Sequence, residues 1–321
     1  MAPPINQLNA FTETHVIPKV VDNLYNSNVL LYILLGKKSK RWPGGTYFET
    51  EMVWAKNANA KAYGANADLA PTAGEEFTKT QYAPVQYDVG IVLEGIDLAI
   101  NKGTHQVVNL AAQKVKNAEQ SLKDLFADHL FNTTQASAFT GLETICATGD
   151  TTLGGVSNAA GNALEWRSSS GLHGRADGPD LTTTELTKAI LDKQYNSCKL
   201  DNDHPDLLIT TDALWSAIMT TYIMPYMRYT DTKMADLGFE NFKYRKATAY
   251  GDDKCDAGYL YFLNSEHVYF AQFSAMNFKF IPWAIETTSK DRWIAHIRWY
   301  GNLICDERRK QAWFDRIATV V

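Results

Sequence analysis

The strongest periodic pattern in the sequence is a helical one between residues 103 and 131. Apolar residues recur there at alternating spacings of three and four, which places them on one stripe of a helix. This stripe consists of Val108, Ala111, Val115, Ala118, Leu122 and Leu125. Thr104 suits the N-cap position. At about 1.5 Å per residue the helix would be on the order of 40 Å long, so we expect a single long spine.

Before this helix the period changes to two, which is typical of β-strands. From Thr46 onward, one face of the expected strand carries Phe48, Met52 and Trp54, and the other carries Tyr47, Glu49, Glu51 and Val53. Residues 77–95 form a second extended segment. The two segments together predict a long β-ribbon.

The stretch between the two strands, YGANADLAPTAGEEF at 63–77, has only Tyr63, Leu69 and Phe77 as large apolar residues. It cannot build a core of its own. Because an isolated two-stranded ribbon is marginal in water, we expect it to lie against another surface, of this chain or of a neighbouring chain.

The rest of the chain mixes helices and strands. Thr182 and Glu185 fit a capping box for a helix running to about Cys198, and Asp212 starts a second helix. The expected strands are HPDLLITT, FKYRKATAY, GYLYFLN and HVYFAQF. The loop at 149–180 is rich in Gly, Ser, Asn and Asp, with Trp166 as its expected anchor.

A long strand near the C-terminus places Trp293, Ala295, Ile297 and Trp299 on one face. We expect it to pair with the strand that precedes the spine helix. The irregular alternation of helices and strands predicts an α+β fold.

Composition narrows the function classes. The chain has 321 residues, 45% of them hydrophobic and 21% charged, and a formal charge of −5. This charge argues against a protein whose main task is to grip nucleic acid through a basic surface. The longest apolar run, residues 29–36, is far shorter than a membrane span, and we expect no signal peptide. Four widely spaced cysteines, Cys146, Cys198, Cys255 and Cys305, predict free thiols.

Motifs for catalysis or metal binding are absent from the sequence. It lacks GxGxxG and HExxH, and GVSNA around Ser157 lacks the second glycine of a nucleophile elbow. The acidic stretches at 201–206 and 251–256 lack metal-ligand spacing, so we interpret them as Asx-rich turns. Glu49 and Glu51 would lie on an exposed ribbon, without a cleft to tune their pKa values. We therefore expect no enzyme, no cofactor and no metal.

Two basic runs could contact phosphates. One consists of Lys37, Lys38, Lys40 and Arg41, and the other of Arg308, Arg309 and Lys310. The interpretation we favour is a solvated loop for the first run and an exposed strand end for the second.

Several blocks of the sequence carry a resemblance to a known family. They include QYAPVQYDVGIVLEGIDLAINKGTHQVVNLAAQKVKNAEQSLKDLF, TTLGGVSNAAGNALEWRS, HPDLLITTDALW, RYTDTKMADLGFENFKYRKATAYGDDKCDAGYLYFLN and IAHIRWYGNLICDERRKQ. In order and wording, from about Ala10 to Ile317, the chain resembles the major capsid protein of tailed bacteriophages, which has the Hong Kong 97-type fold.

The resemblance implies an α+β capsid fold with five parts. These are an N-terminal arm at 1–45, an extended β-hairpin loop at 46–93, a peripheral domain with the spine helix at 94–140, an axial domain at 141–285, and a returning strand of the peripheral domain at 286–321. The extended loop would lie across the adjacent subunit. Its expected interface residues are Trp54, Tyr63, Leu69, Phe77 and Tyr82, and Lys37, Lys38, Lys40 and Arg41 are candidates for facing DNA.

The implied function is self-assembly into the pentamers and hexamers of an icosahedral phage head that encloses double-stranded DNA. The alternative is the shell of an encapsulin-type nanocompartment. Implied partners are further copies of the chain, portal and scaffolding proteins, an optional decoration protein, and packaged DNA held by non-specific contacts, with no membrane. The location would be the virion, assembled in the host bacterial cytoplasm. Lys56, Lys61 and Lys79 lie in or near the loop, and we predict no covalent crosslink through them.

Overall fold

The computed structural model describes residues 28–53, 57–65, 70–74, 76–100, 104–132, 137–147, 151–157, 166–169, 185–200, 202–223, 241–286, 291–314, 317 and 319–320. The chain divides into two compact units, each drawn from three segments. Unit 1 comprises Met1–Thr46, Pro84–Gly141 and Tyr269–Leu303. Unit 2 comprises Tyr47–Ala83, Leu142–Val268 and Ile304–Val321.

Unit 1 is built on a sheet with the strand order β1-β12-β14-β13, in which β4 also pairs with β14. The strands are β1 (Lys40–Trp42), β4 (Val85–Glu94), β12 (Val268–Phe273), β13 (Lys279–Ile285) and β14 (Arg292–Cys305). Strands β4 and β14 run antiparallel, from Arg292 opposite Glu94 to Gly301 opposite Val85. The predicted pairing of the C-terminal strand with the strand before the spine helix is confirmed. The predicted face is confirmed for Ala295, Ile297 and Trp299, which are all buried.

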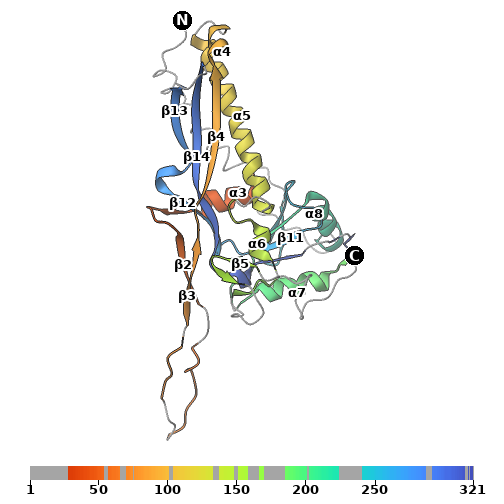
Figure 1. Ribbon diagram of the computed structural model, residues 1–321. Helices are drawn as coiled ribbons and strands as arrows, with labels where there is room; N and C mark the ends of the chain where they lie inside the picture. Colours follow the sequence, from red (N-terminus) through yellow and green to blue (C-terminus); the bar gives the residue numbers. More distant parts are fainter. Residues whose placement is uncertain are drawn as a thin grey trace. The chain divides into compact units, whose positions relative to one another are not determined.

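The spine helix is α5 (Thr104–Phe131), which lies along the β4–β14 pair (Figure 1). Its predicted stripe is confirmed for Ala111, Val115, Ala118 and Leu122, which are buried. Leu125 is only half-buried, and Phe126, one position further, is fully buried. Thr104 is the first residue of the helix, and the side chain of Val108 lies outside the described part of the chain.

An aromatic cluster forms the core between helix and sheet in unit 1. The ring of Phe126 lies 4.8 Å from that of Tyr87 and 5.0 Å from that of Trp299, centroid to centroid. The hydroxyl of Tyr87 lies 2.7 Å from Nδ1 of His129. Unit 1 also contains short helices. α3 (Val29–Leu31) and the π-helix η2 (Tyr32–Lys37) precede β1, and α4 (Gly95–Ile100) follows β4.

Unit 2 is built on a second sheet, with the strand order β15-β11-β8-β10-β9. Its strands are β8 (Leu207–Thr210), β9 (Asn241–Tyr244), β10 (Ala247–Gly251), β11 (Leu260–Leu263) and β15 (Ala312–Phe314). β8 and β10 are parallel, and the other pairs are antiparallel. All residues of β8 are buried, which confirms the predicted buried strand.

Two helices pack on the core of this sheet, α7 (Lys188–Cys198) and α8 (Asp212–Ile218). The predicted start of α8 at Asp212 is confirmed, and the π-helix η4 (Met219–Ile223) continues it. The predicted capping box of α7 is wrong. Its N-cap is Thr187, whose hydroxyl accepts a hydrogen bond from Ile190 N. Glu185 lies in the strand β7 (Glu185–Leu186), paired with β16 (Thr319–Val320), and Thr182 lies outside the described residues.

The remaining elements of unit 2 are short. They are α6 (Leu142–Cys146), β5 (Thr152–Leu153), β6 (Val156–Ser157), the 3₁₀ helix η6 (Arg308–Lys310), and the ribbon strands β2 (Phe48–Val53) and β3 (Phe77–Tyr82). In unit 1 a further 3₁₀ turn, η5 (Ser274–Met276), links β12 to β13. Trp166 is fully buried and its indole N–H donates to the carbonyl of Val156 at 3.1 Å, which confirms its predicted role as an anchor.

Candidate assembly surface on the β2–β3 ribbon

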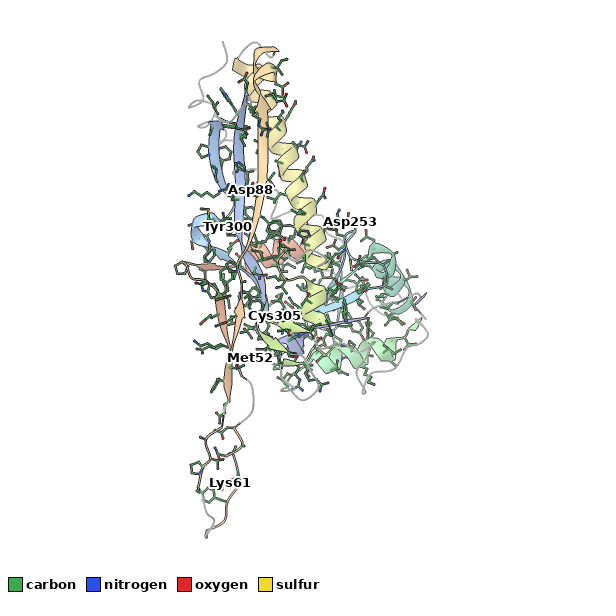
Figure 2. The ribbon with its side chains drawn as sticks, viewed as in Figure 1. Met52, Lys61, Asp88, Asp253, Tyr300 and Cys305 are labelled. Atoms are coloured by element: carbon green, nitrogen blue, oxygen red, sulfur yellow. The ribbon has the colours of Figure 1, made fainter. Side chains whose placement is uncertain are left out.

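Strands β2 and β3 form the predicted ribbon. They pair antiparallel, from Phe48 opposite Tyr82 to Val53 opposite Phe77. The described part of β2 has 6 residues, and residues 54–56 lie outside the described part of the chain. Beyond the two strands, the connection continues as a long loop that carries Lys61, whereas Met52 lies within the ribbon (Figure 2).

The ribbon has an inner and an outer face. On the inner face Phe48, Met52, Thr80 and Tyr82 are buried, and the hydroxyls of Thr50 and Thr80 lie 2.6 Å apart. The outer face is exposed and consists of Glu49, Glu51, Phe77, Lys79 and Gln81. The predicted two-residue alternation is therefore confirmed for Phe48 and Met52.

Polar contacts on the outer face link the two strands. Glu49 receives a hydrogen bond from the amide of Gln81 at 3.0 Å and lies 3.5 Å from Nζ of Lys79. Exposed ion pairs of this kind contribute about 0–1 kcal/mol. This face is therefore held together only weakly by its charges.

The base of the ribbon is attached to the body of unit 2. Gln81 N donates to the carbonyl of Gly154 at 2.9 Å. The hydroxyl of Tyr82 donates to the carbonyl of Cys305 at 2.6 Å and accepts from Cys305 N at 3.4 Å. Because the Tyr82 ring is only 3% exposed, its side chain is used within the subunit. A contact of Tyr82 with a second subunit stays a prediction, and this low exposure gives it no support.

The tip of the ribbon has a different kind of link. The Asn59 side chain donates to the carbonyl of Thr72 at 2.8 Å and accepts from Thr72 N at 3.0 Å. This side chain links the two arms of the loop with a pair of hydrogen bonds, as paired backbone groups do in a β-ladder. The described residues around it, at 57–65 and 70–74, are almost all exposed.

Two of the predicted interface residues are large apolar side chains in contact with solvent. Tyr63 is 67% exposed and Phe77 is 70% exposed. Trp54 and Leu69 lie outside the described residues. A contact of any of these with a second subunit stays a prediction, but the exposure of Tyr63 and Phe77 leaves them available for one.

The first basic run lies at β1. Lys40 and Arg41 are exposed and Lys38 is half-buried. Nζ of Lys40 lies 3.6 Å from the centroid of the Tyr269 ring, a cation–π arrangement. The side chain of Lys37 lies outside the described part of the chain. DNA contact by this run stays a prediction.

The second basic run is not a strand end in solvent, and both hypotheses for it are wrong at Arg308 and Lys310. Arg308 is fully buried, and Lys310 is 7% exposed. The Arg308 guanidinium donates to the carbonyls of Ile145 and Thr144, each at 2.7 Å, and to the hydroxyl of Thr151 at 2.6 Å. Arg308 therefore donates hydrogen bonds to the end of α6 and to the segment that follows α6.

A charged cluster in unit 2 was not foreseen from the sequence. Nδ1 of His267 lies 2.9 Å from Asp306 and Nε2 lies 3.0 Å from Asp203. Lys310 lies 2.5 Å from Asp203 and 2.6 Å from Glu307. These residues are up to 107 positions apart along the chain, so no local pattern points to them.

The cluster shifts the pKa values of its members. Burial lowers the pKa of His267, but hydrogen bonds to Asp306 and Asp203 raise it by more, so that it lies above the ordinary value. Burial raises the pKa of Asp203, but hydrogen bonds from Lys310, His267 and Asn264 outweigh this and hold it well below its usual range. The folded chain therefore favours the charged forms of the His267 imidazole and of the Asp203 carboxylate.

The acidic stretches form turns, as predicted. Leu200 and Asp203 exchange backbone hydrogen bonds at 2.9 and 3.0 Å, and Oδ1 of Asp252 accepts from Lys254 N at 3.0 Å. Within the described residues, no group of three or more His, Cys, Asp or Glu side chains is arranged to hold a metal ion.

None of Cys146, Cys198, Cys255 and Cys305 forms a disulfide, as predicted, and all four are buried. Among the helices that the structure describes, none is both long enough and apolar enough to cross a membrane.

Comparison with known proteins identifies the fold. No family model matches the chain, and no curated protein matches it. Among solved structures, the chain is similar to a chain of the cyanophage A-1(L) capsid asymmetric unit, with a TM-score of 0.64 and 15% identity over 90% of this chain and 92% of that one. It is also similar to the capsid of an empty GTA particle, with a TM-score of 0.55 and 9% identity over 87% of each chain.

A third similar structure is the SrpI encapsulin from Synechococcus elongatus PCC 7942, with a TM-score of 0.54 and 12% identity over 90% of this chain and 86% of that one. At these identities the similarity shows the fold alone. The chain has the α+β capsid fold of the Hong Kong 97 type, and the fold prediction is confirmed. The five domain boundaries expected from the resemblance stay predictions.

Proposed function

We propose that this chain is a phage major capsid protein, which assembles with copies of itself into the pentamers and hexamers of an icosahedral head around double-stranded DNA. The observation that carries the proposal is the ribbon. It is anchored at its base, yet its loop exposes Tyr63 and its outer face exposes Phe77. In a capsid fold, a loop without a core of its own gains stability by lying on another copy of the chain.

The energetics of such contacts suit a closed shell. A standard interface buries about 800 Å² per partner, and an outer face with weak charge pairs adds little affinity. Binding becomes strong when each subunit makes several such contacts at once, because later contacts form at a high effective concentration. The proposed role is structural and needs no catalytic step.

The phage head is favoured over the encapsulin shell for two reasons. The chain of the cyanophage capsid has a TM-score of 0.64 against 0.54 for the encapsulin. In addition, the sequence blocks quoted in the sequence analysis resemble phage coat proteins. The proposal extends to portal and scaffolding proteins as partners, to non-specific contact with packaged DNA, and to a location in the virion after assembly in a bacterial host.

Sedimentation velocity of the purified chain, with the large fractions imaged by negative-stain electron microscopy, tests the proposal. We expect closed shells, or rings of five and six subunits. Removal of residues 63–76 should leave a folded subunit that forms no stable shells. A chain that stays monomeric or dimeric at all salt concentrations, even with phage scaffolding protein added, would overturn the proposal.

The contents of the shells separate the two candidate functions. A phage head expressed with its packaging proteins should contain double-stranded DNA that resists nuclease. An encapsulin should instead copurify with one cargo protein at a fixed ratio, and that result would favour the alternative.

A further inference from the structure

We infer that Tyr82, Gly154 and Arg308 are positioning residues that set the direction of the β2–β3 ribbon within the subunit. They belong to a closed ring in unit 2, made of hydrogen bonds and two short stretches of chain, which we call the anchor ring. Its members in order are the base of β3, Cys305, Arg308, Thr151 and Gly154. The carbonyl of Gly154 bonds to β3 and so closes the ring. The role of the ribbon in assembly rests on the proposed function. The anchor ring itself does not depend on it.

The first link of the anchor ring joins the ribbon to the end of β14. The Tyr82 hydroxyl both donates to and accepts from the backbone of Cys305, at 2.6 and 3.4 Å. Tyr82 and Cys305 are 223 positions apart in the sequence. Both groups are buried, so loss of the hydroxyl would leave backbone groups without one of their partners away from water.

The second link is the guanidinium of Arg308, three residues after Cys305. It donates to the carbonyl of Ile145, at the end of α6, and to the hydroxyl and the carbonyl of Thr151, at 2.6 and 3.3 Å. Thr151 directly precedes β5. The planar fork of an arginine can hold several acceptors in one fixed geometry, so Arg308 fixes where the β5–β6 hairpin begins.

Gly154, at the turn between β5 and β6, closes the anchor ring. Its carbonyl accepts from Gln81 N at 2.9 Å. Its φ is +58°, and an added Cβ would lie 2.9 Å from Cβ of Thr80 and 3.0 Å from Cε2 of Tyr82. A side chain at this position would therefore be strained twice, by the left-handed backbone and by contact with the ribbon.

The anchor ring has a physical consequence for assembly. A two-stranded ribbon alone has no rigid neighbour to fix its direction. When the ring fixes the base in advance, less conformational freedom is lost as the ribbon docks on a second copy, and binding is stronger for the same contacts.

Three variants and one matched control test this inference. Tyr82→Phe removes the hydroxyl and keeps the ring, Thr151→Val removes one acceptor of Arg308, and Gly154→Ala strains the turn. The control is Tyr87→Phe, which removes a buried hydroxyl that lies 2.7 Å from His129 in unit 1. The readouts are thermal unfolding, hydrogen exchange of the β3 amides in unassembled subunits, and the fraction of folded subunits that enter shells.

We expect exchange in β3 to become about tenfold faster in Tyr82→Phe, as for the loss of one buried hydrogen bond. Thr151→Val should show a smaller increase, and the fraction in shells should fall for both. Tyr87→Phe should leave β3 exchange and shell formation per folded subunit unchanged. If Gly154→Ala does not fold, the two other variants still decide the question.

The outcomes separate the inference from the proposed function. Unchanged β3 exchange in Tyr82→Phe would overturn the anchor ring. Faster exchange with normal shell formation would overturn its role in positioning the ribbon for assembly. If the wild-type chain forms no shells at all, the proposed function fails, while β3 exchange still reports whether the ring holds the ribbon.

Discussion

His267 Nδ1 lies 2.9 Å from Oδ1 of Asp306, so that an imidazole joins the turn between β11 and β12 to the end of β14 in unit 2. On its other side Nε2 faces Asp203 at 3.0 Å. Nε2 also lies 2.9 Å from Nζ of Lys310. Lys310 Nζ lies 2.5 Å from Asp203 and 2.6 Å from Glu307, and Nε2 of His267 lies 3.7 Å from Glu307.

This arrangement predicts that unit 2 loses stability as the pH rises above the ordinary pKa of histidine and through the raised pKa of His267. The pKa of His267 is raised in the folded chain, so its contribution is fully present below the ordinary histidine pKa of about 6.5. The contribution disappears as the pH rises through the folded-state pKa. Each unit by which the pKa is raised corresponds to about 1.4 kcal/mol of unfolding free energy.

The measurement is thermal or denaturant unfolding between about pH 6 and about pH 8, with His267→Gln as the comparison. We expect the wild-type protein to lose stability relative to His267→Gln across this range. Asp306→Asn should lower the pKa of His267 and move the loss to lower pH. A constant difference between wild type and His267→Gln would contradict this assignment of the titrating group.

The close packing around Gly301 predicts that a larger side chain at this position destabilises unit 1. A Cβ at this position would lie 2.5 Å from the carbonyl oxygen of Ala271 and 2.5 Å from Cζ2 of Trp299. Because the first of these is a backbone atom, it cannot move aside cheaply. We expect Gly301→Ala to lower the unfolding free energy by about 1–3 kcal/mol, measured by denaturant unfolding.

Gly44→Ala is the matched control for Gly301→Ala. No described atom lies within 4 Å of a Cβ at Gly44, and we expect a change of less than about 0.5 kcal/mol. Equal effects of the two substitutions would show that the contact with Ala271 does not matter.

The exposure of Phe77 predicts that a substitution there impairs assembly without destabilising the folded subunit. Its ring is 70% exposed on the outer face of the ribbon, so Phe77→Ser removes little packing within the subunit. We expect the melting temperature to stay within about 2 °C of wild type, as for a surface substitution, while the fraction of subunits in shells falls severalfold in sedimentation velocity. Lys79→Gln, on the same face, should leave both quantities nearly unchanged.

The buried cysteines predict slow thiol chemistry. Cys146 and Cys305 are both 0% exposed, and burial raises the pKa of each thiol above its ordinary value. Since the thiolate is the reactive form, the native protein should react with a disulfide reagent far more slowly than the protein in denaturant. Rapid reaction of all four thiols in native buffer would contradict their burial.

The parts of the fold that the sequence predicts are those with a sustained local period. The α5 stripe, the β4–β14 pairing and the two faces of the ribbon each rest on several residues in a row. Among the side chains that the structure describes, the stripe was wrong only at its end. Leu125 and Phe126 are three and four positions after Leu122, both spacings are compatible with a helix, and only the aromatic cluster decides in favour of Phe126.

The contacts that attach the ribbon follow no local pattern. Arg308 stands in the charged stretch ERRK, which is typical of a solvated surface, and its burial depends on carbonyls more than 150 positions earlier. Tyr82 was predicted at a subunit surface because it belongs to the ribbon, but its partner is the backbone of Cys305. Long-range polar contacts of this kind become visible only in three dimensions.

Arg308 and His267 hold neighbouring parts of the C-terminal segment by charges with different chemistry. A guanidinium stays protonated through the whole pH range in which proteins are stable, although burial lowers the pKa of Arg308. The imidazole gives up its proton. A rise in pH would therefore weaken the contacts of the turn at His267 before those that Arg308 makes near the base of the ribbon.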